Sequence, residues 1–328
     1  MSEAYPVDGP GWLLEVDPES DGDRLDRFIA RRIPRLSRTR AARLTAVPVD
    51  AHHIPCGAVL RKSSRIRYGQ HLWVSRPLPD EDLSDLTPPR VIDEDQDLLV
   101  LDKPSGWVAH PTASRYRSSI TTWLKEQGWN AHPAHRLDLE TSGLLLCGKT
   151  PEADAELKRL FLTQSVHKSY LAICRAHPDL HAAPLLIGRS WEDHTPLGFD
   201  SESRVGIKIG RGQLDAHTSF KILKLYNHNP ETRLLIEAKP KTGRQHQIRA
   251  HLSLSGLPII GDKLYGPSEE IFIRHLNDEL SEDDIVRLGH PRHGLHAHRL
   301  TLIWRGKECT WECPLPSDLL SLLNDLPS

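Results

Sequence analysis

The chain of 328 residues is poor in cysteine and shows no stretch that resembles a membrane span. No apolar N-terminal run resembles a secretory signal either, so no membrane partner is expected. The five cysteines are scattered and odd in number, which favours a reducing cytoplasm. Cys309 and Cys313 lie near each other, but no second Cys or His pair stands at a matching spacing, so no zinc site is predicted there.

Net charge is also nearly absent, at −2, but its distribution is uneven. Residues 24 to 76 contain thirteen Lys and Arg against two Asp, a net charge of +11, which leaves −13 for the rest of the chain. Such a basic segment on an acidic body is typical of proteins that contact a phosphate backbone and release its counterions. A solvated basic face with no nucleic-acid partner is the alternative interpretation.

The basic segment has the pattern of a small helical and stranded module. A first helix is predicted from Arg24 to Pro34, with one apolar face made of Leu25, Phe28, Ile29 and Ile33. Ser37 is a good N-cap for a second helix reaching Leu44, and residues alternate around Ile66 to Val74 as in a strand. The arginines expected to bind RNA phosphates are Arg24, Arg27, Arg31, Arg38, Arg40 and Arg43.

Composition divides the remaining chain. Residues 1–22 are rich in Pro, Gly, Asp and Glu and are predicted to be a flexible arm with at most one strand, at Trp12 to Val16. Residues 77–90, PLPDEDLSDLTPPR, are predicted to be an extended linker. The length suggests two domains, so we expect an RNA-binding module over 23–76 and a catalytic domain over 91–328.

The stretch from Ala134 to Gly148, AHRLDLETSGLLLCG, joins a polar loop to an apolar run. The run has the length of a short buried strand, so the loop should bring Asp138 to the edge of a buried sheet. A carboxylate where water is scarce can act as a nucleophile or a general base. A loop salt bridge between Arg136 and Asp138 is the alternative.

Further strings surround this stretch. The apolar run from Leu98 to Leu101 is predicted to be a strand that ends at a turn. A helix is predicted to begin at Thr150 and Pro151. In HKSYLAIC, from His167 to Cys174, strand alternation places Tyr170 on the same face as Lys168. A helix from Gln245 would bring His246, Arg249 and Ala250 to one face, and Ser317 could cap a closing helix through Leu323.

The late histidines at 290, 293, 296 and 298 suggest a metal site. Their spacings do not keep them on one helical or strand face, and no carboxylate completes a usual ligand set, so no bound metal is predicted. A metal-dependent hydrolase that uses these histidines remains a competing hypothesis, which metal content would test.

Several of these strings resemble the motifs of RluA-type RNA pseudouridine synthases. They are DKPSGWVAHP, HRLDLETSG, the K-x-Y of HKSYLAIC, PKTGRQHQIRAHL, PIIGDKLYG and GLHAHRLTLIW. The segment RLDRFIARRIPRLSRTRAARL is similar to the S4-like domain that precedes many such catalytic domains. The resemblance implies an α+β fold, with a mixed, mostly antiparallel catalytic sheet and a small N-terminal S4-like RNA-binding domain.

The resemblance also implies roles for individual residues. Asp138 would be the catalytic nucleophile, Tyr170 would stack on the flipped uracil, and Arg249 would pair with Asp138 and keep it ionised. The side chains expected to bind the substrate are His135, Arg136, Arg244 and Leu295, with Arg136 filling the space left by the flipped base and Leu295 in the apolar floor. The family usually has a basic and then an acidic residue after the aspartate, where this chain has Leu139 and Glu140.

The reaction implied is the isomerisation of uridine to pseudouridine in structured ribosomal or transfer RNA. It needs no redox step and no group donor, so no cofactor is expected, and a cytoplasmic monomer with RNA as its partner is predicted. A non-catalytic RNA-binding or ribosome-assembly factor of the same fold is the main alternative, although Asp138, Tyr170 and Arg249 are all present.

Overall fold

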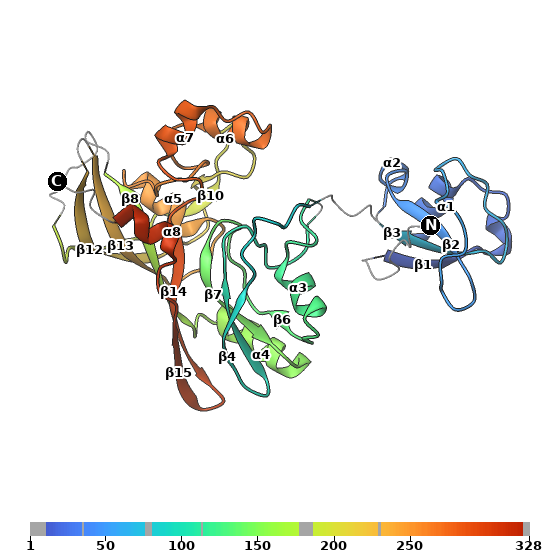
Figure 1. The fold of residues 1–328 in the computed structure, drawn as a ribbon, viewed down its shortest axis with the longest axis horizontal. Coiled ribbons are helices and arrows are strands. Elements are labelled where there is room, and N and C mark those ends of the chain that lie inside the picture. Colours follow the sequence, from blue (N-terminus) through green and yellow to red (C-terminus); the bar gives the residue numbers. More distant parts are fainter. Residues whose placement is uncertain are drawn as a thin grey trace. The chain divides into compact units, whose positions relative to one another are not determined.

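The structure is a computed structural model that describes residues 11–34, 36–75, 81–112, 114–176, 186–228 and 231–323. The chain forms two compact units, Met1–Asp80 and Glu81–Ser328 (Figure 1). In the described parts of the chain, no helix is long and apolar enough to cross a membrane. Each unit has its own hydrophobic core.

Unit 1 is a three-stranded antiparallel sheet with two helices, in the strand order β1-β3-β2. Its elements are β1 (Gly11–Glu15), η1 (Pro18–Ser20), α1 (Leu25–Arg32), α2 (Arg38–Ala41), β2 (Thr45–Val49) and β3 (His71–Ser75). The predicted apolar face of the first helix is confirmed, because Leu25, Phe28, Ile29 and Ile33 are all buried. Ser37 caps α2 through the amide of Arg40, but that helix ends at Ala41, since a turn leads directly into β2.

The structure changes two sequence-based boundaries. The strand predicted at Trp12 to Val16 is present as β1, which begins one residue earlier. The prediction of a flexible arm is wrong for residues 11–22, because β1 pairs along its whole length with β3 and Val16 is fully buried. Residues 1–10 lie outside the described residues. The predicted linker over 77–90 is wrong for residues 81–90, because these residues belong to compact unit 2. Residues 77–80 lie outside the described residues. The Glu81 carboxylate accepts backbone N–H bonds from residues of unit 2, namely Tyr116 (2.6 Å), Arg117 (2.8 Å) and Ser118 (3.0 Å).

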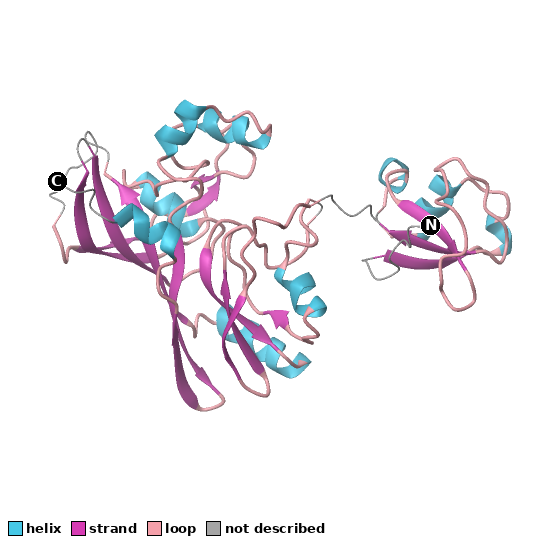
Figure 2. Cartoon of the chain, in the orientation of Figure 1, coloured by secondary structure: helices cyan, strands magenta, loops and turns pink. Residues whose placement is uncertain are grey.

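Unit 2 is built on a ten-stranded sheet (Figure 2). Its path is β4-β5-β7-β14-β8-β13-β12-β9, with β6 added to β7 and β15 added to β14. The strands are β4 (Arg90–Glu94), β5 (Leu98–Lys103), β6 (His132–Pro133), β7 (Ser142–Gly148), β8 (His167–Arg175), β9 (Ser190–Asp193), β12 (Thr218–His228), β13 (Glu231–Pro240), β14 (Leu295–Trp304) and β15 (Lys307–Glu312). Among the described pairings only β7 with β14 is parallel, so the predicted mixed, mostly antiparallel sheet is confirmed.

Alternation along β5 and β7 sends side chains to both faces of the sheet. Leu144 and Leu146 pack with α4 (Pro151–Leu162), while Leu145 and Cys147 pack with α3 (Ile120–Glu126) on the opposite face. The predicted start of α4 is confirmed, because the Thr150 hydroxyl accepts the amide of Ala153. Since β7 is buried along its full length, the loop before it is held at a rigid point of the core.

The other half of the sheet is covered by C-terminal elements. Helix α5 (Gln247–Leu254) packs on β8, β12 and β13, while α8 (Ser317–Leu320) and η2 (Ser321–Leu323) pack against Leu171, Ile173 and Leu235. The remaining elements are β10 (Leu197–Phe199), β11 (Ile209–Arg211), α6 (Glu269–Leu276) and α7 (Glu282–Leu288). Ser317 is the first helical residue of α8 rather than its cap, because Pro316 holds the N-cap position.

Candidate active site

The loop that enters β7 is anchored by a buried lysine. Lys103, the last residue of β5, is fully buried, and burial lowers its pKa to about 7. Its ammonium group donates to three backbone carbonyls, those of Pro104 (3.0 Å), Trp107 (2.8 Å) and Leu139 (3.3 Å). The bond to Leu139 holds the backbone beside Asp138, so the position of the carboxylate is fixed from the core.

A glycine lets the same loop approach β14 closely. Gly143 has φ +109, a conformation that L side chains rarely adopt. A Cβ at this position would stand 2.3 Å from the carbonyl oxygen of Ala297, its partner in the parallel pair. The residue therefore sets how closely the Asp138 loop approaches β14, which begins with Leu295.

The predicted ion pair between Asp138 and Arg249 is present. Arg249 Nη1 donates to Asp138 Oδ2 at 2.9 Å. Burial favours the neutral acid, but the Arg249 charge outweighs it and lowers the pKa of Asp138 below its usual value. Asp138 is thus a carboxylate at neutral pH, while its side chain stays partly accessible, with 23% of its surface exposed.

Arg249 is itself clamped by a second carboxylate, Asp262. Nε and Nη2 of Arg249 donate to the two oxygens of Asp262, at 2.7 and 2.9 Å. Asp262 is fully buried and also accepts the amides of Leu264 and Tyr265, both at 3.0 Å. The guanidinium lies 5.0 Å from the centre of the Tyr265 ring. This fork-to-fork pair leaves Nη1 aimed at Asp138.

His246 lies next to the carboxylate and corrects the predicted helix. Helix α5 begins at Gln247 rather than Gln245, because His246 takes a left-handed conformation, with φ +53. Its Nδ1 is 3.0 Å from the Tyr265 hydroxyl, and its Nε2 is 4.0 Å from Asp138 Oδ2. Burial, with the Arg249 charge, lowers the pKa of His246 to about 4, so the ring is neutral at pH 7.

Asp138 lies on the wall of a cavity of about 520 Å³. Every predicted catalytic and substrate-binding side chain lines this cavity: His135, Arg136, Asp138, Tyr170, Arg244, Arg249 and Leu295. They come from the loop before β7, from β8, from β14, from the segment that enters α5 and from α5 itself. The tertiary structure therefore brings together seven residues that span 160 positions of the sequence. A cavity of this size is large enough for a nucleoside.

Tyr170 and Leu295 form an apolar part of the cavity wall. Tyr170 is half-buried in β8 and packs against two hydrophobic clusters of unit 2. Burial, with the negative charge of Asp138, raises the pKa of the Tyr170 phenol, so it keeps its proton at neutral pH. Leu295 is buried at the start of β14. Together they offer an aromatic face and an aliphatic side chain to a planar base.

The other three cavity residues differ in their bonding. Arg136 is exposed and makes no ion pair among the described residues. Arg244 donates through Nε to the carbonyl of Asp215 at 2.8 Å, which fixes its side chain at the rim. His135 accepts the amide of Leu146 at 3.1 Å and stacks on Phe161, so its ring supports β7 and α4 as well as lining the cavity.

Glu140, at one of the two positions that depart from the family pattern, faces inward. It accepts Lys263 Nζ at 2.6 Å and the amide of His293 at 3.0 Å. The four late histidines bond to other groups rather than to one another. His290 bonds to the Arg292 carbonyl and His293 to Thr141 and Glu140, while His296 and His298 share the Cys313 carbonyl. They therefore form no common ligand set. The sequence predicts no site role for Asp262, Tyr265 or His246. Asp262 and Tyr265 lie in the string PIIGDKLYG, and His246 lies in PKTGRQHQIRAHL.

The basic residues of unit 1 separate into two groups. Arg24 and Arg38 both pair with the buried Asp26, and Arg31 pairs with Asp23. Their charges are partly neutralised within the unit, so we expect these three arginines to contribute less to phosphate binding than unpaired arginines would. The exposed side chains of Arg27, Arg40 and Arg43 make no ion pair among the described residues.

Comparison with known proteins identifies the family. The chain is 32% identical over 336 residues to a ribosomal large subunit pseudouridine synthase D of Zymomonas mobilis, covering 97% of this chain and 98% of the relative. The chain belongs to the RluA-type RNA pseudouridine synthases. A second relative with the same name, from Nitrosomonas europaea, is 30% identical and covers 94% of this chain and 86% of its own length.

Two further comparisons agree with this family. The model for RNA pseudouridylate synthases matches residues 97–254, a range that contains Asp138, Tyr170 and Arg249. Human RNA pseudouridylate synthase domain containing 1 shares the fold, with a TM-score of 0.53 at 21% identity over 71% of this chain and 86% of that one. The pseudouridine synthase is therefore an enzyme that isomerises uridine to pseudouridine in RNA, and the α+β catalytic fold expected from the sequence is confirmed.

Proposed function

We propose that Asp138 is the nucleophile of this pseudouridine synthase. One observation carries the proposal: an ionised carboxylate, held by Arg249 at 2.9 Å, lies on the wall of a nucleoside-sized cavity that Tyr170 and Leu295 also line. The Asp138 carboxylate would form a transient bond to the bound uridine, at C1′ of the sugar or C6 of the base, and this bond would break again before release. The C1′–N1 bond breaks, the base rotates, the C1′–C5 bond forms, and the C5 proton ends on N1. Atoms and charge then balance without a cofactor.

The surrounding residues would hold the flipped nucleotide. Tyr170 would stack on the base in place of its lost neighbours, with Leu295 as the apolar floor. Arg136, exposed at the cavity, would enter the space that the base has left in the RNA. Arg244 and His135 would line the path of the sugar and phosphate, with Arg244 pre-oriented by its bond to the Asp215 carbonyl.

The substrate and its recognition form the second part of the proposal. We propose a uridine of large-subunit ribosomal RNA, because two relatives that match nearly the whole chain carry that name. Unit 1 would act as an S4-like domain that binds phosphates through Arg27, Arg40 and Arg43. The enzyme would work in the cytoplasm as a monomer, where newly made ribosomal RNA is found.

The substitution Asp138→Asn tests the role of the carboxylate. Asparagine keeps the shape of the side chain but cannot act as a nucleophile, so we expect pseudouridine formation to fall by more than about 1,000-fold while RNA binding is retained. The product is mapped by carbodiimide-stop sequencing of unmodified ribosomal and transfer RNA. Asp278→Asn, at an exposed position, should keep full activity. Turnover by the Asp138 variant would rule out the proposed role.

The same assay tests the substrate. Stops at one or a few uridines of large-subunit RNA would support the proposed target, whereas stops in transfer RNA alone would contradict it. RNA binding by the wild-type protein without any stop would favour the non-catalytic assembly factor.

A further inference from the structure

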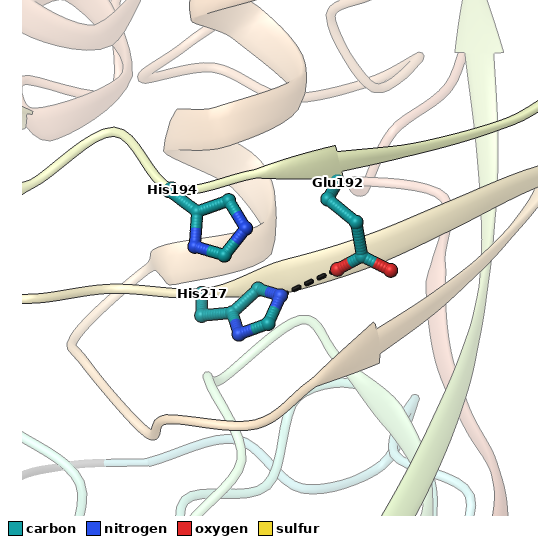
Figure 3. Close-up of side chains that lie close together, drawn as sticks. All are labelled: Glu192, His194 and His217. Carbon is teal, nitrogen blue, oxygen red and sulfur yellow. Dashed lines mark hydrogen bonds and ion pairs between the residues drawn. The ribbon is translucent and has the colours of Figure 1, made fainter.

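A second cluster of chemically active side chains lies on the edge strand of the unit 2 sheet, outside the cavity. Figure 3 shows Glu192, His194 and His217 with their polar ends converging. One ligand atom from each residue lies within 4.8 Å of the other two. None of the three lines the cavity around Asp138.

Strand pairing explains why these residues meet. In the β9–β12 ladder, Asp193 stands opposite Thr218 and Glu192 stands opposite Ser219. One step further along the same register places His194 opposite His217, and their ring centres are 3.9 Å apart. Glu192 and His194 are two residues apart, so they project from the same side of the edge strand.

Hydrogen bonds organise part of the cluster. The Ser219 hydroxyl donates to Glu192 Oε2 at 2.8 Å, and His217 Nε2 also bonds to this carboxylate. Both bonds lower the pKa of Glu192, so it is an anion at neutral pH. His194 is exposed, and among the described residues its ring makes no hydrogen bond; its one ring contact is the stack on His217. Two imidazoles and a carboxylate are thus held together with nitrogen atoms still available.

We propose that Glu192, His194 and His217 bind a divalent transition-metal ion, of which Zn²⁺ and Ni²⁺ are the test cases. Two imidazole nitrogens and one carboxylate oxygen are a ligand set that suits borderline metals, with water in the remaining positions. The metal would replace the hydrogen bond between His217 Nε2 and the Glu192 carboxylate. Imidazoles bind metals only in their neutral form, so binding should weaken as the pH falls.

The metal would sit next to the backbone that supports the catalytic cavity. The His217 carbonyl accepts the amide of Lys241 at 2.9 Å and Gln247 Nε2 at 2.9 Å, and the His217 amide donates to the Thr242 hydroxyl at 3.0 Å. Lys241, Thr242 and Gln247 belong to the segment that lines the cavity. A bound ion would therefore tie the sheet edge to this segment without touching the substrate.

The test uses the full chain carrying Cys56→Ser, which removes an exposed thiol that could bind metal elsewhere. After treatment with EDTA and dialysis, Ni²⁺ and Zn²⁺ are titrated by calorimetry. We expect one equivalent to bind, His194→Ala and His217→Ala each to weaken binding by at least tenfold, and Glu192→Gln to weaken it less. Saturating metal should raise the Tm by about 5 °C, a rise that His194→Ala abolishes.

Two controls make the result decisive. His52→Ala removes an exposed histidine of unit 1 and should bind metal like the parent protein. His194→Ala, measured in EDTA, should keep the parent Tm and the parent rate of pseudouridine formation, which shows that it is folded. The proposal is wrong if the parent binds no metal, or if His194→Ala binds it as tightly as the parent does.

Discussion

At the scale of single residues, the site depends on a carboxylate that does not itself line the cavity. Asp262 is fully buried and holds two of the three Arg249 nitrogens, so that the third can pair with Asp138. Burying either charge alone would be unfavourable, so the buried carboxylate and the buried guanidinium each depend on the presence of the other. The position of the nucleophile thus depends on a residue 124 positions away in the sequence.

Removing that charge should destabilise unit 2. We expect Asp262→Asn to lower the free energy of unfolding by about 3 to 5 kcal/mol, because Arg249 keeps its charge in a buried place with one acidic partner fewer. Urea denaturation measures the change. Glu270→Gln is the matched control, since the Arg204–Glu270 pair is exposed and screened by solvent, so its loss should change stability little. Equal effects of the two substitutions would contradict this account.

A buried histidine makes a pH-dependent contribution. His296 is 1% exposed, bonds to the Ser142 hydroxyl and the Cys313 carbonyl, and has its pKa lowered by burial from 6.5 to about 4. The folded state therefore binds this proton less readily than the unfolded chain. The stability contributed by neutral His296 is complete above pH 6.5 and is lost as the pH falls towards 4, by about 3 kcal/mol.

The measurement is the free energy of unfolding against pH for the wild type and His296→Gln. We expect the substitution to reduce the loss of stability between pH 6.5 and 4. His132→Gln, at an exposed position, should retain the wild-type profile. The assignment fails if His296→Gln and the wild type lose stability equally over this range.

At the scale of elements, the contact between β7 and β14 positions the site. It joins strands whose ends carry the Asp138 loop and Leu295, and among the described strands of the ten-stranded sheet it is the one parallel pairing. It also needs a glycine, because no side chain fits between Gly143 and the Ala297 carbonyl. The geometry of the cavity thus follows from how closely two strands approach.

Gly143→Ala should disturb both stability and activity. The added Cβ meets backbone at 2.3 Å and φ is +109, so we expect a loss of at least about 3 kcal/mol and a lower rate of pseudouridine formation. Gly128→Ala separates the two causes, because Gly128 also has a positive φ (+78) but has nothing within 4 Å of its Cβ position. It should cost only about 1 kcal/mol. If the two variants are equally stable, the close approach is not what requires glycine at 143.

At the scale of the whole molecule, charge is divided between a basic segment and an acidic remainder, although the total is −2. Arg27, Arg40 and Arg43 lie exposed in unit 1, while their neighbours Arg24, Arg31 and Arg38 pair with its own aspartates. Affinity for RNA should therefore reside in the first three and fall with salt as counterions compete.

Replacing Arg27, Arg40 and Arg43 together by Gln should weaken RNA binding and leave the rate at saturating RNA unchanged. The slope of log affinity against log salt should become shallower by about 2, since roughly 0.7 to 0.9 of a counterion is released per phosphate contact. Lys307→Gln, on the exposed β14–β15 hairpin, is the control and should change neither quantity. An unaltered slope in the triple variant would remove unit 1 from the proposed RNA contact.

Local order along the chain was sufficient to predict several elements and the identities of the site residues. The runs at Leu98 and Leu144 became β5 and β7, Thr150 capped α4, and alternation from His167 placed Tyr170 in β8, because each depends on neighbours in sequence. The strings that resembled the family also contained Asp138, Tyr170 and Arg249, and these do line one cavity.

Other features were decided only by contacts between distant residues. Composition predicts a loose arm over residues 11–22, but β1 in this range pairs with β3. Helix α5 starts at Gln247 because His246 bonds to Tyr265 and takes a left-handed conformation. The Asp262 clamp, and the meeting of His194 with His217 through strand register, have no signal in local composition. Local sequence thus accounts for several elements around the site and for the chemical groups that the enzyme carries. Which of these groups lie within bonding distance depends on the folded chain, because burial and strand pairing act between residues that are far apart in the sequence.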